Sequence, residues 1–159
     1  MRVTAYSEGM TQLSDRPQAA NSPELIDSLL AARGATWAVV GLTDNPDRVA
    51  KSIASFLKHE LGMQVVPVNL RRESVDGDRA YGRLAEIPDP VDVVHVFVNG
   101  SSAERVVEEA IRKGVSTIWF QLGVDSPSAV DRALEAGLNV VVDTCPSIEG
   151  RMRSLGWRM

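Results

Sequence analysis

Five short apolar runs recur along the chain, and segments with helical periodicity separate them. The runs are continuous rather than alternating, as in VHVFV, VSTIWF and NVVV, which predicts strands that are covered on both faces. A spacing of roughly 22 to 28 residues between them suits repeated βα units. The pattern therefore predicts an α/β fold: a doubly wound, Rossmann-like parallel sheet of about five strands with helices on both faces. The expected strand starts are Thr36, Gln64, Val91, Val115 and Leu138.

The segments between the apolar runs contain helix-start signals. An amphipathic pattern predicts a leading helix that stops near Gly34 and packs on the sheet. The segment from residue 71 to residue 90 lacks strong periodicity, and we expect only a short helix there, around residues 79–84. The expected starts of the main helices are Ser22-Pro23, Asn45-Pro46 with Asp44 or Asn45 as cap, a capping box at Ser101–Glu104, and Ser126-Pro127.

Composition indicates one domain preceded by a polar arm. The 159 residues are 44% hydrophobic, which suits a single core. Residues 1–21 are polar, aperiodic and rich in turn formers, so we expect a flexible N-terminal arm there and a domain over residues 22–159. Met10 is a possible alternative start.

Charge and cysteine content exclude several classes of function. With 17 basic and 21 acidic residues the net charge is −4, which argues against a general nucleic-acid or membrane binder. No apolar run approaches the roughly 20 residues that span a bilayer, and the N-terminus lacks a signal-peptide pattern. The single cysteine, Cys145, excludes an internal disulfide and fits a reducing compartment. We therefore expect a cytoplasmic protein.

In a doubly wound sheet, ligands bind outside the carboxyl ends of the strands. Four segments should meet there: residues 41–45, 69–72, 98–102 and 121–125. In the first, Gly41 permits a tight turn, Thr43 offers a hydroxyl, and the following helix presents its positive end. Pro46 lacks an N–H, so Asp47 and Arg48 would supply the donors. This turn predicts phosphate binding, although any strand-to-helix turn favours similar residues.

The second strand end suggests which phosphate-bearing ligand is bound. The first turn, GLTDNP, has one glycine where a dinucleotide fingerprint has three, and Asn69 replaces the acidic residue that accepts the ribose hydroxyls of NAD. Arg71 and Arg72 could clamp a phosphate on the ribose, as in NADP or in coenzyme A (CoA). They could equally belong to a solvated loop in which Glu73 pairs with one of them.

Several motifs together resemble a known family. They are WAVVGLTDNPDR, VVPVN, AYGRLAEIPDPVDVVHVF, WFQLGV and GLNVVVDTCPSIE, in this order. The chain resembles the small stand-alone CoA-binding proteins, which are similar to the CoA-binding N-terminal domain of the succinyl-CoA synthetase alpha subunit. The resemblance covers roughly residues 25–152 and implies a Rossmann-like domain that binds CoA.

The resemblance also implies a role for individual residues. The loop after the first strand would hold the diphosphate, with two cations on the next helix facing it; these residues are Gly41, Leu42, Thr43, Asn45, Arg48 and Lys51. The end of the second strand would line the adenosine through Pro67, Val68 and Asn69, with Arg71 or Arg72 at its 3′-phosphate. The later strand ends would flank the pantetheine arm, through Phe97, Val98, Gln121, Leu122 and Gly123.

Candidates for catalysis are few. His95 lies inside an apolar strand, where a buried histidine paired with a neighbour is the better interpretation than a base. Cys145 is expected to be a small buried residue, since no histidine is near it in sequence. Asp143 and Glu149 could form a carboxylate pair, but spacing alone does not bring their carboxyl groups together. His59, near a helix end, suits the helix dipole, and no metal-ligand cluster is visible.

Three functions remain open. The first is a non-catalytic CoA or acyl-CoA binding module, acting as carrier, sensor or docking subunit. The second is an NADP-dependent reductase or other nucleotide-dependent enzyme. The third is a fold retained for protein interaction. A homo-oligomer or a partner protein is compatible with each of them.

Overall fold

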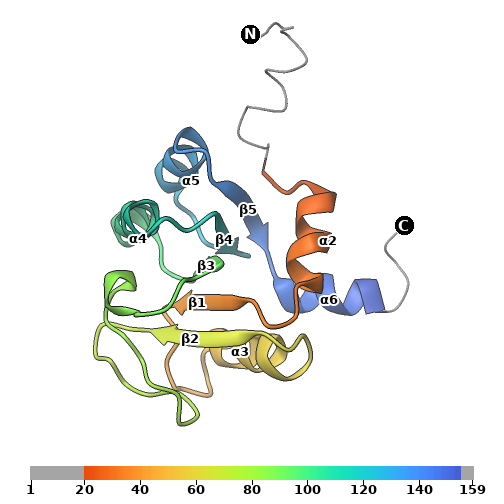
Figure 1. The fold of residues 1–159 in the computed structure, drawn as a ribbon, viewed down its shortest axis with the longest axis vertical. Coiled ribbons are helices and arrows are strands. Elements are labelled where there is room, and N and C mark those ends of the chain that lie inside the picture. The colour runs from red at the N-terminus through yellow and green to blue at the C-terminus, as the bar shows by residue number, and fades with distance from the viewer. Residues whose placement is uncertain (1–19, 155–159) are drawn as a thin grey trace, which may run out of the picture.

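A single five-stranded parallel sheet, in the order β2-β1-β3-β4-β5, forms the centre of the molecule (Figure 1). The computed structural model describes residues 20–154 of the chain. The predicted α/β doubly wound architecture is confirmed, and each strand begins within a few residues of its expected start. The strands are β1 (Thr36–Val40), β2 (Gln64–Val68), β3 (Val93–Val96), β4 (Thr117–Gln121) and β5 (Asn139–Thr144).

Helices cover both faces of the sheet, as expected. On one face α2 and α3 pack against Trp37 and Val39 of β1. On the other face α4 and α5 pack against Ala38 and Val40. Figure 1 shows α4 and α5 on the side opposite α2 and α6. The helices are α2 (Pro23–Ala31), α3 (Val49–His59), α4 (Gly100–Lys113), α5 (Pro127–Glu135) and α6 (Pro146–Ser154), with a 3₁₀ turn, η1 (Leu84–Glu86).

Two expected helix starts are wrong. The helix α4 begins at Gly100 with Asn99 as its N-cap, and the capping box does not form. The Asn99 side chain accepts a hydrogen bond from the Asp125 amide instead, at 2.8 Å, and so joins two strand-end loops. The helix α3 begins at Val49 rather than Pro46. The Asn45 side chain accepts from the Asp47 amide at 2.9 Å, which closes a local turn and delays the helix.

The long segment after β2 lies along the edge of the sheet. Tyr81 forms an isolated parallel bridge with Val68, in which its amide donates to the Pro67 carbonyl at 3.0 Å and its carbonyl accepts from the Asn69 amide at 2.9 Å. Backbone that pairs in this way is extended. The helix expected around residues 79–84 is therefore absent, and the helical turn comes later, at Leu84–Glu86.

The chain joins the sheet at Asn21. Its amide donates to the Val140 carbonyl at 3.1 Å, and its side chain exchanges hydrogen bonds with the backbone of Val142. Residues 1–19, which contain nearly all of the predicted arm, lie outside the described residues. Within residues 20–154, no helix is long and apolar enough to cross a membrane.

Candidate functional site

The strand order reverses between β1 and β3, and the turn after β1 lies at this reversal. Gly41 has a φ of +100°, and its amide donates to the Val68 carbonyl at 2.9 Å. A Cβ atom at this position would lie 3.1 Å from the Cβ of Phe97. The backbone after β1 therefore passes so close to the end of β3 that only glycine fits without strain.

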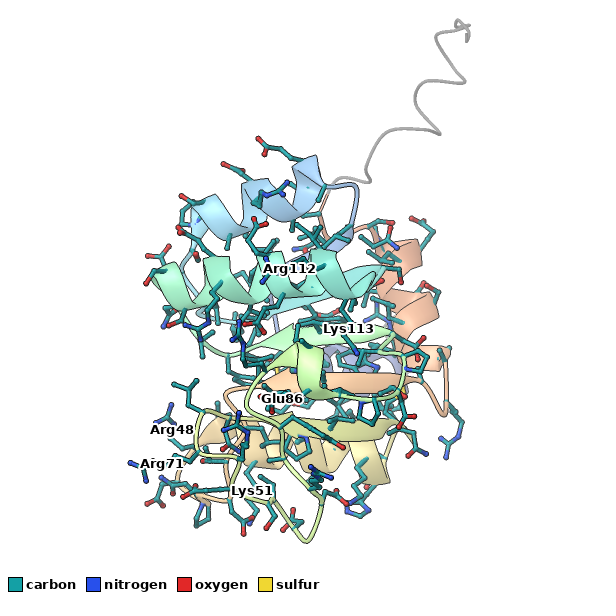
Figure 2. The ribbon with its side chains drawn as sticks, turned by 60° about the vertical axis from the view of Figure 1, so that its left-hand side comes forward. Arg48, Lys51, Arg71, Glu86, Arg112 and Lys113 are labelled. Carbon is teal, nitrogen blue, oxygen red and sulfur yellow. The ribbon has the colours of Figure 1, made fainter. Side chains whose placement is uncertain are left out.

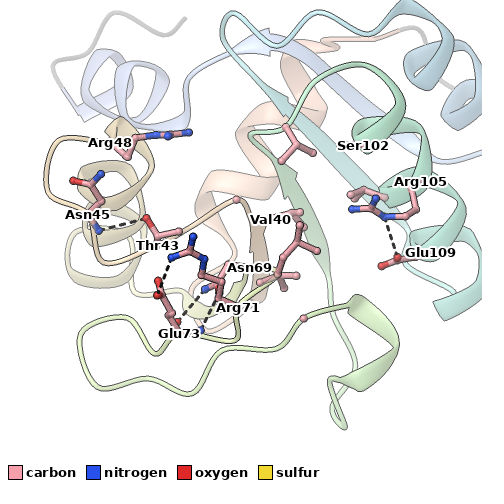
Figure 3. Close-up of a pocket in the computed structure, with 16 residues that line it drawn as sticks. Val40, Thr43, Asn45, Arg48, Asn69, Arg71, Glu73, Ser102, Arg105 and Glu109 are labelled. Carbon is pink, nitrogen blue, oxygen red and sulfur yellow. Dashed lines mark hydrogen bonds and ion pairs between the residues drawn. The ribbon is translucent and has the colours of Figure 1, made fainter.

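A cleft of about 550 Å³ opens beside this turn, at the carboxyl ends of β1, β2 and β3 (Figure 3). Its floor is apolar, because it is formed by Val40 and Val68, the last residues of β1 and β2. The structure brings together here eight of the residues that the sequence predicted. They are Gly41, Thr43, Asn45, Arg48, Val68, Asn69, Arg71 and Val98.

A second, smaller cleft of about 200 Å³ lies on the other side of the same turn. Gly41 and Arg48 line both clefts, so the two adjoin along the edge of the sheet. The remaining predicted residues of the later strand ends lie in this smaller cleft. They are Phe97, Gln121, Leu122 and Gly123.

Four predicted residues do not line either cleft. Leu42 is 1% exposed and belongs to the core, and Pro67 is also buried. Lys51 is held by two carboxylates, with its Nζ 2.8 Å from Asp44 and 3.4 Å from Asp76.

Arg72, the fourth, pairs with Glu86 at 2.6 Å. This ion pair, together with the Gly82 amide, lowers the pKa of Glu86 from 4.5 to about 2.

In Figure 2, Arg48, Lys51 and Arg71 lie at the same end of the molecule, while Arg112 lies along α4.

The Asn69 side chain has a structural role that explains its position. Its amide nitrogen donates to the carbonyls of Leu42, at 3.1 Å, and of Glu73, at 2.9 Å, and its oxygen accepts from the Glu73 amide at 2.9 Å. It is 9% exposed. Asn69 thus ties the loop after β1 to the loop after β2 and fixes the shape of the larger cleft.

The helix α4 supplies a wall of the larger cleft, of which the sequence predicted only the first residue, Ser102, within the segment 98–102. Its four lining residues follow helical spacing, i, i+3, i+4 and i+7. The predicted segment ends at residue 102, in the first turn of α4, whereas this stripe continues along the helix to Glu109. The sequence does carry a signal for this wall, because Ser102, Arg105 and Glu109 form a polar stripe at helical spacing. The residues are Ser102, Arg105, Val106 and Glu109.

Positive charge faces the cleft although the whole chain is acidic. No ion-pair partner for Arg48 exists among residues 20–154. Arg71 is 84% exposed and lies 3.8 Å from Glu73, a loose contact. Arg105 lies 3.7 Å from Glu109. Guanidinium groups from three elements are therefore available to an anion in the cleft.

The buried residues beside the smaller cleft are engaged in hydrogen bonds. His95 is fully buried, and its Nε2 is 2.8 Å from the Gln121 Oε1, which confirms the prediction of a buried, paired histidine. Burial lowers the pKa of His95 to about 4, although the hydrogen bond to Gln121 opposes this shift. A histidine of this kind is neutral near pH 7, and its Nε2 is already occupied.

Cys145 is 7% exposed, as predicted, and its Sγ lies 3.2 Å from the Ser147 hydroxyl. Burial raises the pKa of its thiol, but hydrogen bonds from Ser147, Gln121 and the backbone of residues 147 and 148 outweigh burial and lower it. Asp143 and Glu149 are engaged separately, with the Gly123 amide and with Arg153. Residues 20–154 contain no cluster of three His, Cys, Asp or Glu side chains that could hold a metal.

A protein-family model described as "CoA binding domain" matches residues 35–151, which include all five strands and both clefts. The match therefore covers most of the chain and the whole candidate site.

Individual relatives agree with this match. The Bacillus subtilis (strain 168) protein YneT, described as uncharacterized, is 32% identical over 108 residues, 68% of this chain and 79% of that protein. The acetate–CoA ligase [ADP-forming] II subunit alpha of Pyrococcus furiosus is 32% identical over 94 residues, 59% of this chain but only 20% of the ligase subunit. A solved structure of a hypothetical protein from Pyrococcus horikoshii OT3 has 35% identity and a TM-score of 0.78, and the match covers 89% of this chain and 97% of that one.

Proposed function

The chain belongs to the CoA-binding domain family, and from this premise we propose that it binds coenzyme A or an acyl-CoA at the two strand-end clefts. We propose further that it acts without catalysis, as a carrier, a sensor or a docking module. The observation that carries the proposal is the pair of adjoining clefts that share Gly41 and Arg48. The larger suits the nucleotide of CoA, and the smaller suits the pantetheine arm.

The diphosphate would lie at the shared point between the clefts. Gly41 lines both clefts, and because it has no Cβ the backbone can pass close to Phe97 at this point. The helix α3 begins beside this place, since Val49 and Ala50 line the smaller cleft, and Arg48 supplies a positive charge at its N-cap. This arrangement would offset part of the negative charge of the two phosphates at the junction from which the nucleotide and the arm would diverge.

The adenosine would lie against the apolar floor of the larger cleft. Val40 and Val68 form this floor, and Val98 and Val106 continue it toward α4. A flat base buries apolar surface well in such a slot. The arm would follow Phe97 and Leu122 in the smaller cleft, with its thiol end near Gln121.

The chemistry of the site supports binding more than catalysis. His95 is neutral near pH 7 and hydrogen-bonded at Nε2, and the Cys145 thiol is buried and contacts Ser147 and Gln121. The P. furiosus relative is an acetate–CoA ligase subunit, and this chain spans a fifth of it. A docking role, in which this domain holds CoA for a partner that carries catalytic groups, is compatible with that relation.

An NADP-dependent function is the second candidate. One observation favours it: no acidic side chain follows β2 directly, and Arg71 at this strand end lines the cleft, where it could meet a ribose phosphate. The adjoining smaller cleft, which suits a long flexible arm, favours CoA instead.

Isothermal titration calorimetry with CoA, acetyl-CoA and NADPH tests the proposal. We expect CoA and acetyl-CoA to bind with one site per chain, and NADPH to bind at least tenfold more weakly. Tight NADPH binding without any response to CoA would reverse the ranking. Consumption of acetyl-CoA or NADPH by the protein alone would contradict the non-catalytic role.

A further inference from the structure

Arg105 lies on the α4 wall of the larger cleft, across from Arg71 (Figure 3). Its side chain is 51% exposed, and its one ion pair, with Glu109 at 3.7 Å, is too long for a firm hydrogen bond. Its guanidinium group therefore retains donors that can be directed at a ligand.

Glu109 positions this arginine and does not fully neutralise it. The Glu109 side chain is only 6% exposed, and its Oε1 accepts from the Leu84 amide at 3.2 Å. Its Oε2 is shared between Arg105 and Arg83, which lies at 3.5 Å. Two guanidinium groups thus share one buried carboxylate, and a net positive charge remains at this end of the cleft.

Arg72 is not available to the same ligand. Its guanidinium makes two hydrogen bonds to Glu86, at 3.1 Å and 2.6 Å, and it does not line the cleft. Of the cations that do line the larger cleft, Arg48 lies at the junction with the smaller cleft. Arg71 and Arg105 remain, on opposite walls of the same cleft.

From this geometry we propose that Arg105, together with Arg71, binds the ribose 3′-phosphate of CoA, and that Glu109 is the positioning residue for Arg105. The inference rests on the proposed function and adds a residue and a specificity to it. Arg71 and Arg105 each offer a planar guanidinium, which suits a phosphate better than an ammonium group does. The site would then distinguish CoA from dephospho-CoA, which lacks this phosphate.

The alternative is that Arg105 and Glu109 form only an i,i+4 ion pair on a helix. The two roles make different predictions. A merely structural pair would affect folding and would be indifferent to the ligand. A phosphate contact would affect one ligand of a matched pair and leave the other unchanged.

Calorimetric titration of four proteins with CoA and with dephospho-CoA separates these roles. The proteins are the wild type, Arg105→Gln, Arg105→Lys and Arg112→Gln. Arg112 is the matched control, because it is exposed on the same helix two turns further on and does not line the cleft. Thermal melting of each variant verifies that it is folded.

We expect Arg105→Gln to weaken CoA binding about tenfold or more and to change dephospho-CoA binding less than twofold, because one charged hydrogen-bonding group is lost. Arg105→Lys keeps the charge without the planar fork and should show an intermediate loss for CoA. Arg112→Gln should change neither affinity. If Arg105→Gln fails to fold, Arg105→Lys carries the same comparison.

Equal weakening of both ligands, or no weakening of either, overturns the assignment while the proposed function stands. If the wild-type protein binds CoA and dephospho-CoA equally well, no residue of this chain contributes binding energy through the 3′-phosphate, and the inference fails. If the wild type binds neither, the proposed function fails, and this inference fails with it.

Discussion

The guanidinium group of Arg72 holds the Glu86 carboxylate through two hydrogen bonds, Nε to Oε1 at 3.1 Å and Nη2 to Oε2 at 2.6 Å. The Gly82 amide donates to the same carboxylate at 3.0 Å. A Cβ atom on Gly82 would lie 2.9 Å from the Arg72 guanidinium carbon, so the arginine packs directly against this glycine. Gly82 lines the cleft, whereas Arg72 does not. Of the two adjacent arginines, only Arg71 lines the cleft.

The first prediction concerns this pair. Arg72→Gln should change CoA affinity less than twofold, because the side chain does not line the cleft, whereas Arg71→Gln should weaken CoA binding several-fold. Calorimetric titration of both variants with CoA measures the two affinities, and the same Arg-to-Gln change is made at both positions. A larger loss for Arg72→Gln than for Arg71→Gln would show that the ion pair with Glu86 opens when the ligand binds.

The same pair predicts a dependence of stability on pH. The pKa of Glu86 is lowered from 4.5 to about 2, mainly by the hydrogen bond from Arg72. A lowered carboxyl pKa stabilises the fold above the unfolded pKa, and this contribution is lost as the pH falls from about 4.5 toward 2. Arg72→Gln should therefore lose less stability over this interval than the wild type does. Parallel melting curves for the two proteins in acid would contradict the assignment.

The second prediction concerns Gly41. Gly41→Ala should destabilise the protein by about 1–3 kcal/mol through backbone strain and should weaken CoA binding at least tenfold, because its Cβ would lie 3.1 Å from Phe97. Gly114→Ala is the control, since Gly114 also has positive φ but has open space and ends α4 far from the clefts. It should lose stability and keep its affinity. Retained affinity in Gly41→Ala would place the diphosphate elsewhere.

The third prediction concerns His95, whose pKa is lowered from 6.5 to about 4 by burial. The unfolded chain takes up a proton below pH 6.5 while the folded chain does not. Stability should therefore fall as the pH decreases from 6.5 to 4, by about 3 kcal/mol at most.

His95→Gln, which can keep the hydrogen bond to Gln121, should flatten this slope in urea unfolding measured at several pH values. His59→Gln, a substitution at an exposed histidine, is the comparison variant. An unchanged slope in His95→Gln would mean that another group governs the transition.

The fourth prediction concerns Glu109. Glu109→Gln should lower the free energy of unfolding by about 1–3 kcal/mol, because the buried site then loses the charge that offsets Arg83 and Arg105. Its neighbour Glu108 pairs with Arg132 at the surface, and Glu108→Gln should cost clearly less. Denaturant unfolding of both variants measures the difference. Equal costs would mean that burial of Glu109 has no energetic consequence.

Much of the fold could be predicted because its signals are local. Continuous apolar runs marked all five strands, and Ser22 caps α2 as expected, with its hydroxyl accepting from the Leu25 amide. The errors arose where a long-range contact decides the local structure. The Asn99 side chain makes no capping hydrogen bond to α4, because it accepts from the amide of Asp125 instead. The residues near Tyr81 are extended because they pair with β2.

The candidate site could be predicted only in part, for a similar reason. Topology places strand-end loops at one edge, so Gly41, Asn69 and Gln121 were found from their positions alone. The residues of the α4 wall beyond Ser102 could not be predicted, because the sequence does not show which face of this helix lines the cleft. The direction of an arginine side chain depends on the nearest carboxylate, so Arg71 and Arg72 could not be told apart before Glu86 was located.

The most direct test of the whole account is an NMR titration of ¹⁵N-labelled protein with CoA. Glycine amides mark both ends of the sheet: Gly41, Gly82 and Gly123 line the two clefts, while Gly34, Gly62 and Gly137 precede strands at the opposite end. The account predicts that saturating CoA shifts the first three resonances and leaves the second three in place. Shifts confined to the second set, or no shift in either, would contradict it.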